Sequence, residues 1–353
     1  MFPEFHGNRP VVEALEQMIG NGRIPQTLLF AGSEGIGKAT LARRFGARLL
    51  GGAGKIDHDD LSLPHNAGYL NEREKWPADK RSEDPLLFAT HPDFLTFAPD
   101  GPLRQISIQQ MRLLKERAQF KPLRGQRRVF LIDQIDRAFE QAANSLLKIL
   151  EEPPDHLILI LTAANPYDLL PTIRSRAVWF HFAPLADDEM CEFVRARGLD
   201  HPERRIALAR GSPGLAVSLD LETYDRRRTA MLALLEVAAG AAPFAAWLQQ
   251  SESAANRQEK LEHLLRILYS LLEDLLVLRF SGAHIRNADL RAQLQAIAAR
   301  VSFPWIRKAV QKVDELADLL RRNIEAAASP LLATHRLTSE ALPCPQCPAA
   351  LCR

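Results

Sequence analysis

The stretch that decides the fold runs from Arg128 to Pro154 and reads RVFLIDQIDRAFEQAANSLLKILEEPP. Its apolar run Val129–Ile132 shows no alternation, which is typical of a strand buried on both faces of a parallel sheet. Asp133 follows at the strand end, where open α/β sheets place their ligands. A helix is predicted next, with one apolar face, and Pro153-Pro154 ends it. The face consists of Phe139, Ala142, Ala143, Leu146, Leu147 and Leu150.

A phosphate-binding loop precedes this stretch in the chain. Residues 27–31 (TLLFA) read as another buried strand, and GSEGIGK follows at residues 32–38. Helix formers then continue to residue 50. Strand, G-x-x-x-x-G-K and helix form the P-loop pattern, in which backbone amides surround phosphate oxygens and the lysine adds a positive charge. The candidate nucleotide-binding residues are Gly32, Gly35, Gly37, Lys38 and Asp133.

Two groups that an active P-loop ATPase uses are missing from this pattern. The residue after the lysine is Ala39, where such enzymes have a magnesium-binding Ser or Thr. Thr40 lies about 100° further round the helix and is expected to point elsewhere. Gln134 follows Asp133 and carries an amide that cannot take a proton from water. The sequence therefore predicts a phosphate site without hydrolysis, and it leaves open whether ATP or ADP binds.

Composition indicates an ordinary globular protein of two or three domains. The chain has 353 residues, a formal charge of +2, 46% hydrophobic and 25% charged residues, so the charge balance alone does not indicate nucleic-acid binding. No run of 18 apolar residues occurs, and we expect a cytoplasmic protein without membrane contact. Four cysteines give no disulfide framework.

The chain divides by composition into four regions. We expect an α/β P-loop core at residues 1–183, a small helical lid at 184–222, an all-α domain at 223–340 and a disordered tail at 341–353. Within the core, residues 51–90 are polar and irregular, which predicts a surface insertion. The insertion contains His58 and His65 but no cysteine, so a flexible loop is favoured over a metal site.

Other features allow two interpretations each. Ser107 and Gln110 have capping-box spacing; the helix that they begin is either an ordinary capped helix or, together with Arg104, a contact for the phosphate backbone of DNA. A leucine stripe at residues 261–276 belongs either to the core of the monomer or to a subunit interface. In the tail, Cys344, Cys347 and Cys352, with His335 upstream, favour disorder over a zinc or redox site.

The segment LLPTIRSRA, residues 169–177, carries two arginines before a predicted strand. Arg174 and Arg176 either form structural salt bridges or offer a guanidinium to the triphosphate of a neighbouring subunit. Such an arginine finger contributes about 10³- to 10⁵-fold in rate. The residues alone do not decide between these interpretations.

Together, the stretch from Val129 to Pro154, the HPD triplet at residues 91–93 and LLPTIRSRA resemble the delta-prime group of bacterial DNA polymerase III clamp-loader subunits, which are AAA+ proteins. The resemblance covers roughly residues 5–219. It implies that Asp133 is the Walker B aspartate and that Arg176 is the arginine finger facing the ATP of an adjacent motor subunit. It also implies that the all-α domain is a collar that holds five subunits in a ring, and for this reason we expect the leucine stripe to belong to that subunit interface.

This sequence departs from the family pattern at several positions. Ala177 replaces a cysteine after the finger arginine, Ala163-Ala164 replace a polar sensor, and Gly214 stands where motor subunits have a lid arginine. The four-cysteine zinc module that the family often carries in the insertion is expected to be lost, because residues 51–90 have no cysteine.

The resemblance and these departures predict a non-hydrolysing stator subunit of the polymerase holoenzyme. Its expected partners are gamma/tau-like and delta-like subunits in a pentameric ring, and through them the sliding clamp and primed DNA. The alternatives are an active gamma/tau-like motor that uses Thr40 and an unrecognised base, and an AAA+-derived adaptor without a replication role.

Overall fold

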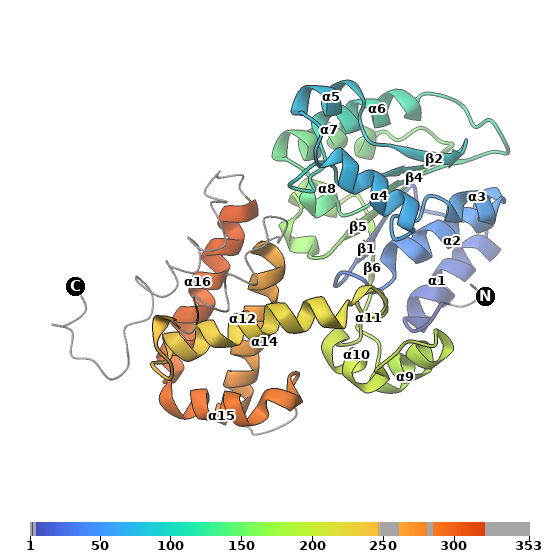
Figure 1. Cartoon of the computed structure of the whole chain (residues 1–353). Coiled ribbons are helices and arrows are strands. Elements are labelled where there is room, and N and C mark those ends of the chain that lie inside the picture. The colour runs from blue at the N-terminus through green and yellow to red at the C-terminus, as the bar shows by residue number, and fades with distance from the viewer. Residues whose placement is uncertain (1, 3–4, 246, 248–260, 281–284, 322–353) are drawn as a thin grey trace. The chain divides into compact units, whose positions relative to one another are not determined.

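The computed structural model describes residues 2, 5–245, 247, 261–280 and 285–321, and it consists of two compact units (Figure 1). The first comprises Met1–Ser218 and the second Leu219–Arg353. The first unit therefore holds the predicted core together with most of the predicted lid. The predicted tail, with Cys344, Cys347 and Cys352, lies outside the described residues, as does His335.

The centre of the first unit is a six-stranded sheet in the order β2-β3-β4-β5-β1-β6. All neighbouring strands are parallel except β2 and β3, which are antiparallel. The predicted mainly parallel sheet is thus confirmed. The strands are β1 (Thr27–Ala31), β2 (Phe88–His91), β3 (Phe94–Phe97), β4 (Arg128–Ile132), β5 (Leu157–Ala163) and β6 (Val178–His181).

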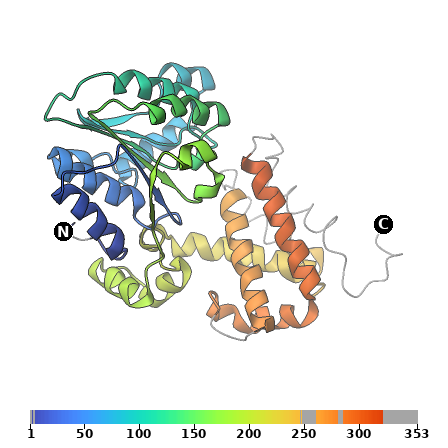
Figure 2. The same ribbon diagram turned by 180° about the vertical axis from the view of Figure 1, so that it is seen from behind.

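Helices cover both faces of this sheet, as Figure 2 shows. Because successive strand residues point to opposite faces, alternate residues of β4 belong to two different core clusters. Phe130 and Ile132 pack with α6 (Ile108–Ala118) and α7 (Glu140–Glu151). Val129 and Leu131 pack with α1 (Arg9–Gly20) and α2 (Lys38–Leu50). Burial on both faces explains why β4 reads as an uninterrupted apolar run.

One residue of the predicted apolar helix face does not belong to it. Phe139 precedes α7 as its N-terminal flanking residue, and 44% of it is exposed. The 3₁₀ turn Ile135–Arg137 separates it from β4, so the helix begins later than its apolar spacing suggested.

The sequence predicted an irregular surface segment for the insertion, and this prediction is wrong. The insertion contains three short helices, α3 (Ala53–Asp57), α4 (Pro64–Arg73) and α5 (Ala78–Glu83). Arg73, the last residue of α4, has a completely buried side chain that bonds to Asp84, which follows α5, and to Asp100. These helices are too short and too polar to show a clear 3.6-residue pattern, and the contact of Arg73 with Asp100 reaches outside the insertion.

A lid of three helices completes the first unit: α9 (Asp187–Ala196), α10 (Pro202–Ala209) and α11 (Pro213–Ser218). It has a small core of its own, which includes Met190, Val194 and Ala216. Two further short elements, the 3₁₀ turn Pro166–Asp168 and α8 (Pro171–Arg174), lie between β5 and β6.

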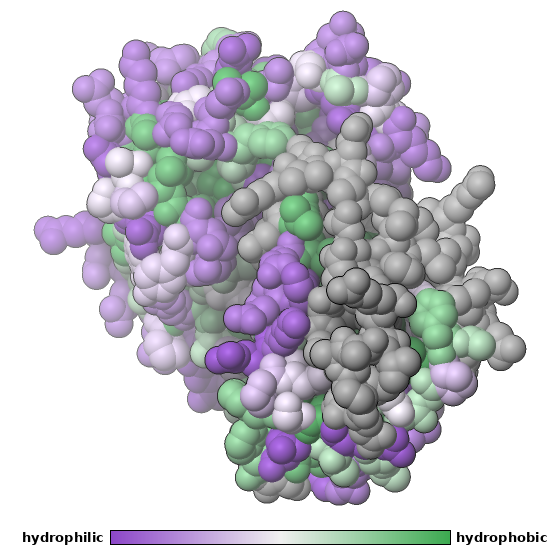
Figure 3. Space-filling model, turned by 90° about the vertical axis from the view of Figure 1, so that its left-hand side faces the viewer, coloured by the Kyte–Doolittle hydropathy of each residue, from purple (hydrophilic) through white to green (hydrophobic). Residues whose placement is uncertain are grey.

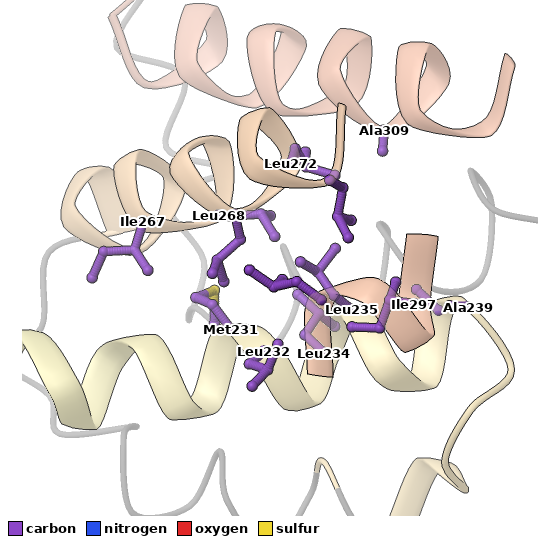
Figure 4. Close-up of a cluster of buried hydrophobic side chains, with 14 of the residues drawn as sticks. Met231, Leu232, Leu234, Leu235, Ala239, Ile267, Leu268, Leu272, Ile297 and Ala309 are labelled. Atoms are coloured by element: carbon purple, nitrogen blue, oxygen red, sulfur yellow. The ribbon is translucent and has the colours of Figure 1, made fainter. Parts of the chain in front are cut away.

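Every secondary-structure element in the described residues of the second unit is a helix or a 3₁₀ turn. The unit contains α12 (Leu221–Ala238), α14 (Leu261–Phe280), the 3₁₀ turn Ala288–Leu290, α15 (Arg291–Arg300) and α16 (Phe303–Arg321). Figure 4 shows Leu268 and Leu272 of α14 pointing toward Met231 and Leu235 of α12.

The leucine stripe of α14 is therefore core of its own unit. Leu264, Leu265, Leu268, Leu271, Leu272 and Leu275 are all buried there. The expected subunit interface at this stripe is wrong, because an amphipathic pattern shows that a face is buried and not what buries it. Any collar contact must use other residues of this unit.

The surface carries no extended apolar band on the face that Figure 3 presents; outside the grey atoms, hydrophilic and hydrophobic side chains are mixed there. Among the described helices, none is both long and apolar enough to span a bilayer.

Candidate functional site

The P-loop connects β1 to α2 and places Lys38 at the first turn of the helix. Lys38 is 7% exposed, and its ammonium group donates hydrogen bonds to the carbonyls of Gly32 and Ser33. The lysine therefore lies folded over its own loop. Burial lowers the pKa of Lys38, and the nearby carboxylates of Asp133, Asp136 and Glu34 partly oppose this shift.

The lid contacts this loop through backbone and hydroxyl groups. The amide of Gly214 donates to the carbonyl of Gly35 over 2.8 Å. The Ser212 hydroxyl, itself buried, donates to the carbonyl of Glu34 over 2.9 Å. We call these two hydrogen bonds the lid clasp. It lies where the resemblance places the lid arginine of a motor subunit, so the lid here contacts the loop itself.

Glycines make this close approach possible. A Cβ atom on Gly214 would lie 2.8 Å from the carbonyl oxygen of Gly35, and one on Gly35 would lie 2.5 Å from the Ser212 hydroxyl oxygen. Gly35 also has φ +73°, a conformation that L side chains rarely adopt. Gly37 approaches the ring of Phe5 in the same way, with 2.9 Å to its hypothetical Cβ. The predicted loop glycines thus serve packing against protein.

Acidic groups surround the loop lysine. Glu34, within the loop, forms an ion pair with Arg137 over 2.8 Å. Asp133 and Asp136 follow β4, and both attract Lys38. Phosphate binding at this loop would bring a polyanion toward three carboxylates, which is electrostatically unfavourable without a bound cation. Among the described residues, no group of three or more His, Cys, Asp or Glu is arranged to hold a metal ion.

Asp133 is held by a residue that sequence reasoning overlooked. The Thr162 hydroxyl donates to the carboxylate of Asp133 over 2.6 Å, and accepts from the amide of Gln134 over 2.8 Å. Thr162 is fully buried in β5. It is the polar member of the otherwise apolar strand LILILTA, and a lone hydroxyl in a buried strand signals a hydrogen-bond partner on a neighbouring strand.

Arg176 lies between α8 and β6, the edge strand of the sheet. Its guanidinium donates to the Thr172 carbonyl over 2.9 Å and to the Glu151 carboxylate over 2.8 Å. About a third of the side chain is exposed. Within the described residues, its hydrogen bonds and its ion pair involve neither Lys38 nor Asp133. The structure therefore brings the P-loop residues and Asp133 together and places Arg176 apart from them.

The two candidate DNA contacts have protein partners. Arg104 donates to Glu74 over 2.7 Å and to Asn71 over 3.1 Å, both of which belong to the insertion region. Ser107 and Gln110 form the predicted capping box at the start of α6, which is thus confirmed. Contact of Arg104 or Ser107 with DNA stays a prediction.

Two family matches cover most of the chain. The family described as "DNA polymerase III, delta subunit" matches residues 72–186, and "DNA polymerase III, delta subunit, C terminal" matches residues 223–339. The first range contains Asp133 and Arg176. The chain belongs to the DNA polymerase III delta-subunit family. The resemblance to the clamp-loader delta-prime group is confirmed.

Individual relatives agree with this assignment. The delta' subunit of Pseudomonas aeruginosa is 32% identical over 56% of this chain and 56% of its own length. The delta' subunit of Escherichia coli is 29% identical over 60% of this chain and 63% of its own length. The tau/gamma subunit of Haemophilus influenzae is 26% identical over 55% of this chain and 25% of its own length. The chain thus spans a quarter of that relative's length and about three fifths of the delta' relatives.

A DNA polymerase III gamma subunit-related protein from Thermotoga maritima aligns over 92% of this chain and 97% of its own, with a TM-score of 0.47 and 18% identity. The predicted fold class, an α/β P-loop core with a mainly parallel sheet followed by a helical lid and a helical C-terminal domain, is confirmed by the strands and helices of the described residues.

Asp136 gives a testable pH dependence. Burial raises the pKa of its carboxyl, although the amide of Ala164 donates to it over 3.0 Å and lowers the pKa in part. A raised folded-state pKa means that the charged form destabilises the fold above that pKa, and that this cost disappears as the pH falls through it. Asp136→Asn is therefore expected to raise the melting temperature at pH 7, with a difference that shrinks toward pH 4. Thermal unfolding at both pH values measures this; a lower melting temperature at pH 7 would contradict it.

Proposed function

We propose that this chain is a non-hydrolysing stator subunit of a DNA polymerase III clamp loader. The lid clasp carries the proposal. The lid and the P-loop are joined by Gly214 and Ser212 through backbone carbonyls, at a point where two glycines leave no room for side chains. A lid that is already hydrogen-bonded to the loop does not need a γ-phosphate to hold it there. The absent hydroxyl at Ala39 and the amide of Gln134 support the same conclusion.

In this function the chain contributes a residue to the ATP site of an adjacent subunit. Arg176 is presented at the edge of the sheet on an exposed surface, as an arginine finger for the ATP of an adjacent gamma/tau-like subunit requires. The second unit would provide the collar that joins delta-like and gamma/tau-like subunits in a ring. The assembled ring would load a sliding clamp onto primed DNA.

Nucleotide binding by the chain itself is proposed to be weak and without turnover. The loop glycines and Lys38 are retained, but Lys38 is bonded to its own loop and three carboxylates lie near it. Purified chain titrated with a fluorescent ATP analogue measures the affinity, and a steady-state phosphate-release assay measures turnover. We expect no phosphate release above the uncatalysed background.

The alternatives predict other results. Appreciable phosphate release by the isolated chain would favour the gamma/tau-like motor, with Thr40 and another carboxylate in the missing roles. For the stator, mixing the chain with gamma/tau-like and delta-like subunits of the same organism should give one complex in native mass spectrometry. A chain that stays alone in that mixture would instead fit an adaptor without a replication role.

A further inference from the structure

The residue that holds Arg176 in place has no assigned role so far. Glu151 is the last residue of α7, immediately before Glu152 and Pro153-Pro154. Its carboxylate accepts from Arg176 Nη2 over 2.8 Å. Arg176 Nη1 donates to the carbonyl of Thr172 in α8, so the guanidinium is fixed between two helices.

The position of Glu151 is unfavourable without its partner. The C-terminal end of a helix carries partial negative charge, and a carboxylate there is repelled unless a cation lies beside it. Arg176 supplies this cation. The pair therefore holds the arginine at one defined point of the surface. The Glu151 carboxylate stays bound to it because the arginine offsets the repulsion at the helix end.

This contact leaves the arginine able to bind a second anion. A guanidinium has five N–H groups, and the bonds to Glu151, to Thr172 and, over 3.4 Å, to the Ser175 hydroxyl use at most three of them. A phosphate oxygen can therefore bind Arg176 while Glu151 remains in place. Fixing a long side chain beforehand removes part of the ordering cost that binding would otherwise include.

We propose that Glu151 is the positioning residue of the arginine finger: it orients Arg176 toward the triphosphate of the neighbouring subunit. This proposal rests on the proposed function. The pair contributes little to folding, because both side chains are substantially exposed, 34% for Arg176 and 51% for Glu151, and exposed ion pairs stabilise proteins only slightly. An effect of Glu151 on catalysis can therefore be separated from an effect on stability.

The test uses the reconstituted complex of this chain with a gamma/tau-like ATPase subunit, at saturating subunit concentration. With Mg-ATP as substrate, Glu151→Ala is expected to lower kcat about 2- to 10-fold, with KM for ATP changed less. Glu151→Gln keeps an acceptor oxygen and should lose less. Glu152→Ala is the matched control, because Glu152 is exposed at the same helix end and forms no recorded ion pair with Arg176. It should behave like the unchanged chain.

The variants also separate this proposal from the one on which it rests. If Arg176→Ala lowers turnover while Glu151→Ala and Glu152→Ala give equal kcat, the positioning role is wrong and the stator function stands. Higher turnover in Glu151→Ala would show that Glu151 competes with phosphate, which also overturns the proposal. If Arg176→Ala itself leaves turnover unchanged, the arginine finger is wrong. The double variant Glu151→Ala/Arg176→Ala should match Arg176→Ala, because the two residues act through one interaction.

Discussion

Replacement of Arg176 by alanine is expected to lower ATP hydrolysis at the neighbouring site by about 10³-fold or more, while the complex still assembles. A finger of this kind stabilises charge that develops on the transferred phosphoryl group, so its loss raises the barrier by roughly 4–7 kcal/mol. The relevant measurement is ATP turnover by a complex of this chain with one gamma/tau-like subunit, because other active sites of a full ring would mask the loss.

Folding of the variant is expected to be unaffected, since the Arg176–Glu151 pair is exposed. Arg176→Lys is the informative control. Lysine keeps the charge but lacks the planar fork of donors, so it should restore only part of the turnover. Turnover equal to that of the unchanged chain in Arg176→Ala, with assembly intact by native mass spectrometry, would remove Arg176 from the mechanism.

The second large effect is expected at Arg73, in the insertion. Arg73→Met should lower the free energy of unfolding of its region by about 3–5 kcal/mol, the usual result of removing one partner from a buried ion pair. The guanidinium is fully buried and bonds to both carboxylate oxygens of Asp100, over 2.7 Å and 3.1 Å. Without it, the Asp100 carboxylate, 8% exposed, loses its countercharge.

Other contacts of the same guanidinium add to this effect. Asp84 accepts through its backbone carbonyl over 2.6 Å, and the ring of Trp76 lies 4.7 Å from the guanidinium carbon. Burial disfavours the charge, but the bonds to Asp100 and Tyr69 outweigh it and raise the pKa of Arg73 above its ordinary value. Arg73 therefore stays charged at every pH at which the protein folds.

Urea denaturation followed by tryptophan fluorescence, together with hydrogen exchange of residues 64–101, measures the loss. Arg104→Met is the matched control, because Arg104 contacts the same region through Glu74 but 30% of its side chain is exposed; a change of about 1 kcal/mol or less is expected there. Arg73→Met/Asp100→Asn should regain part of the stability, since the uncompensated carboxylate is gone. Equal stability of Arg73→Met and Arg104→Met would refute the prediction.

The ion pairs of Arg73 can hold the insertion in its folded form without a metal ion. This ion-pair network joins α4 and the segment after α5 to Asp100, beyond β3. The sequence showed that residues 51–90 lack cysteine, but not that one arginine connects them. Acidic partners 11 and 27 residues away from Arg73 leave no local pattern.

The sequence by itself determined the buried strands on either side of the site and the P-loop pattern, but not the antiparallel edge strand β2, which begins within the region predicted as an irregular insertion. Val129–Ile132 and residues 27–31 are apolar without alternation because both faces of those strands are buried, and this holds in the structure for every residue of β1 and β4. The G-x-x-x-x-G-K loop and the aspartate after β4 followed from the same local rules, as did the capping box at Ser107. Local backbone geometry and burial restrict which residue types occur at nearby positions. These features can therefore be recognised in a single sequence.

Only the tertiary structure decided what those parts contact. The lid clasp joins Gly214 to Gly35, 179 positions apart by their numbers, and the Thr162–Asp133 bond crosses between two strands. The leucines of α14 proved to be core of their own unit, and Arg176 proved to be held by Glu151. Each of these contacts depends on how distant elements pack together, and residue type and spacing along the chain contain no record of that packing.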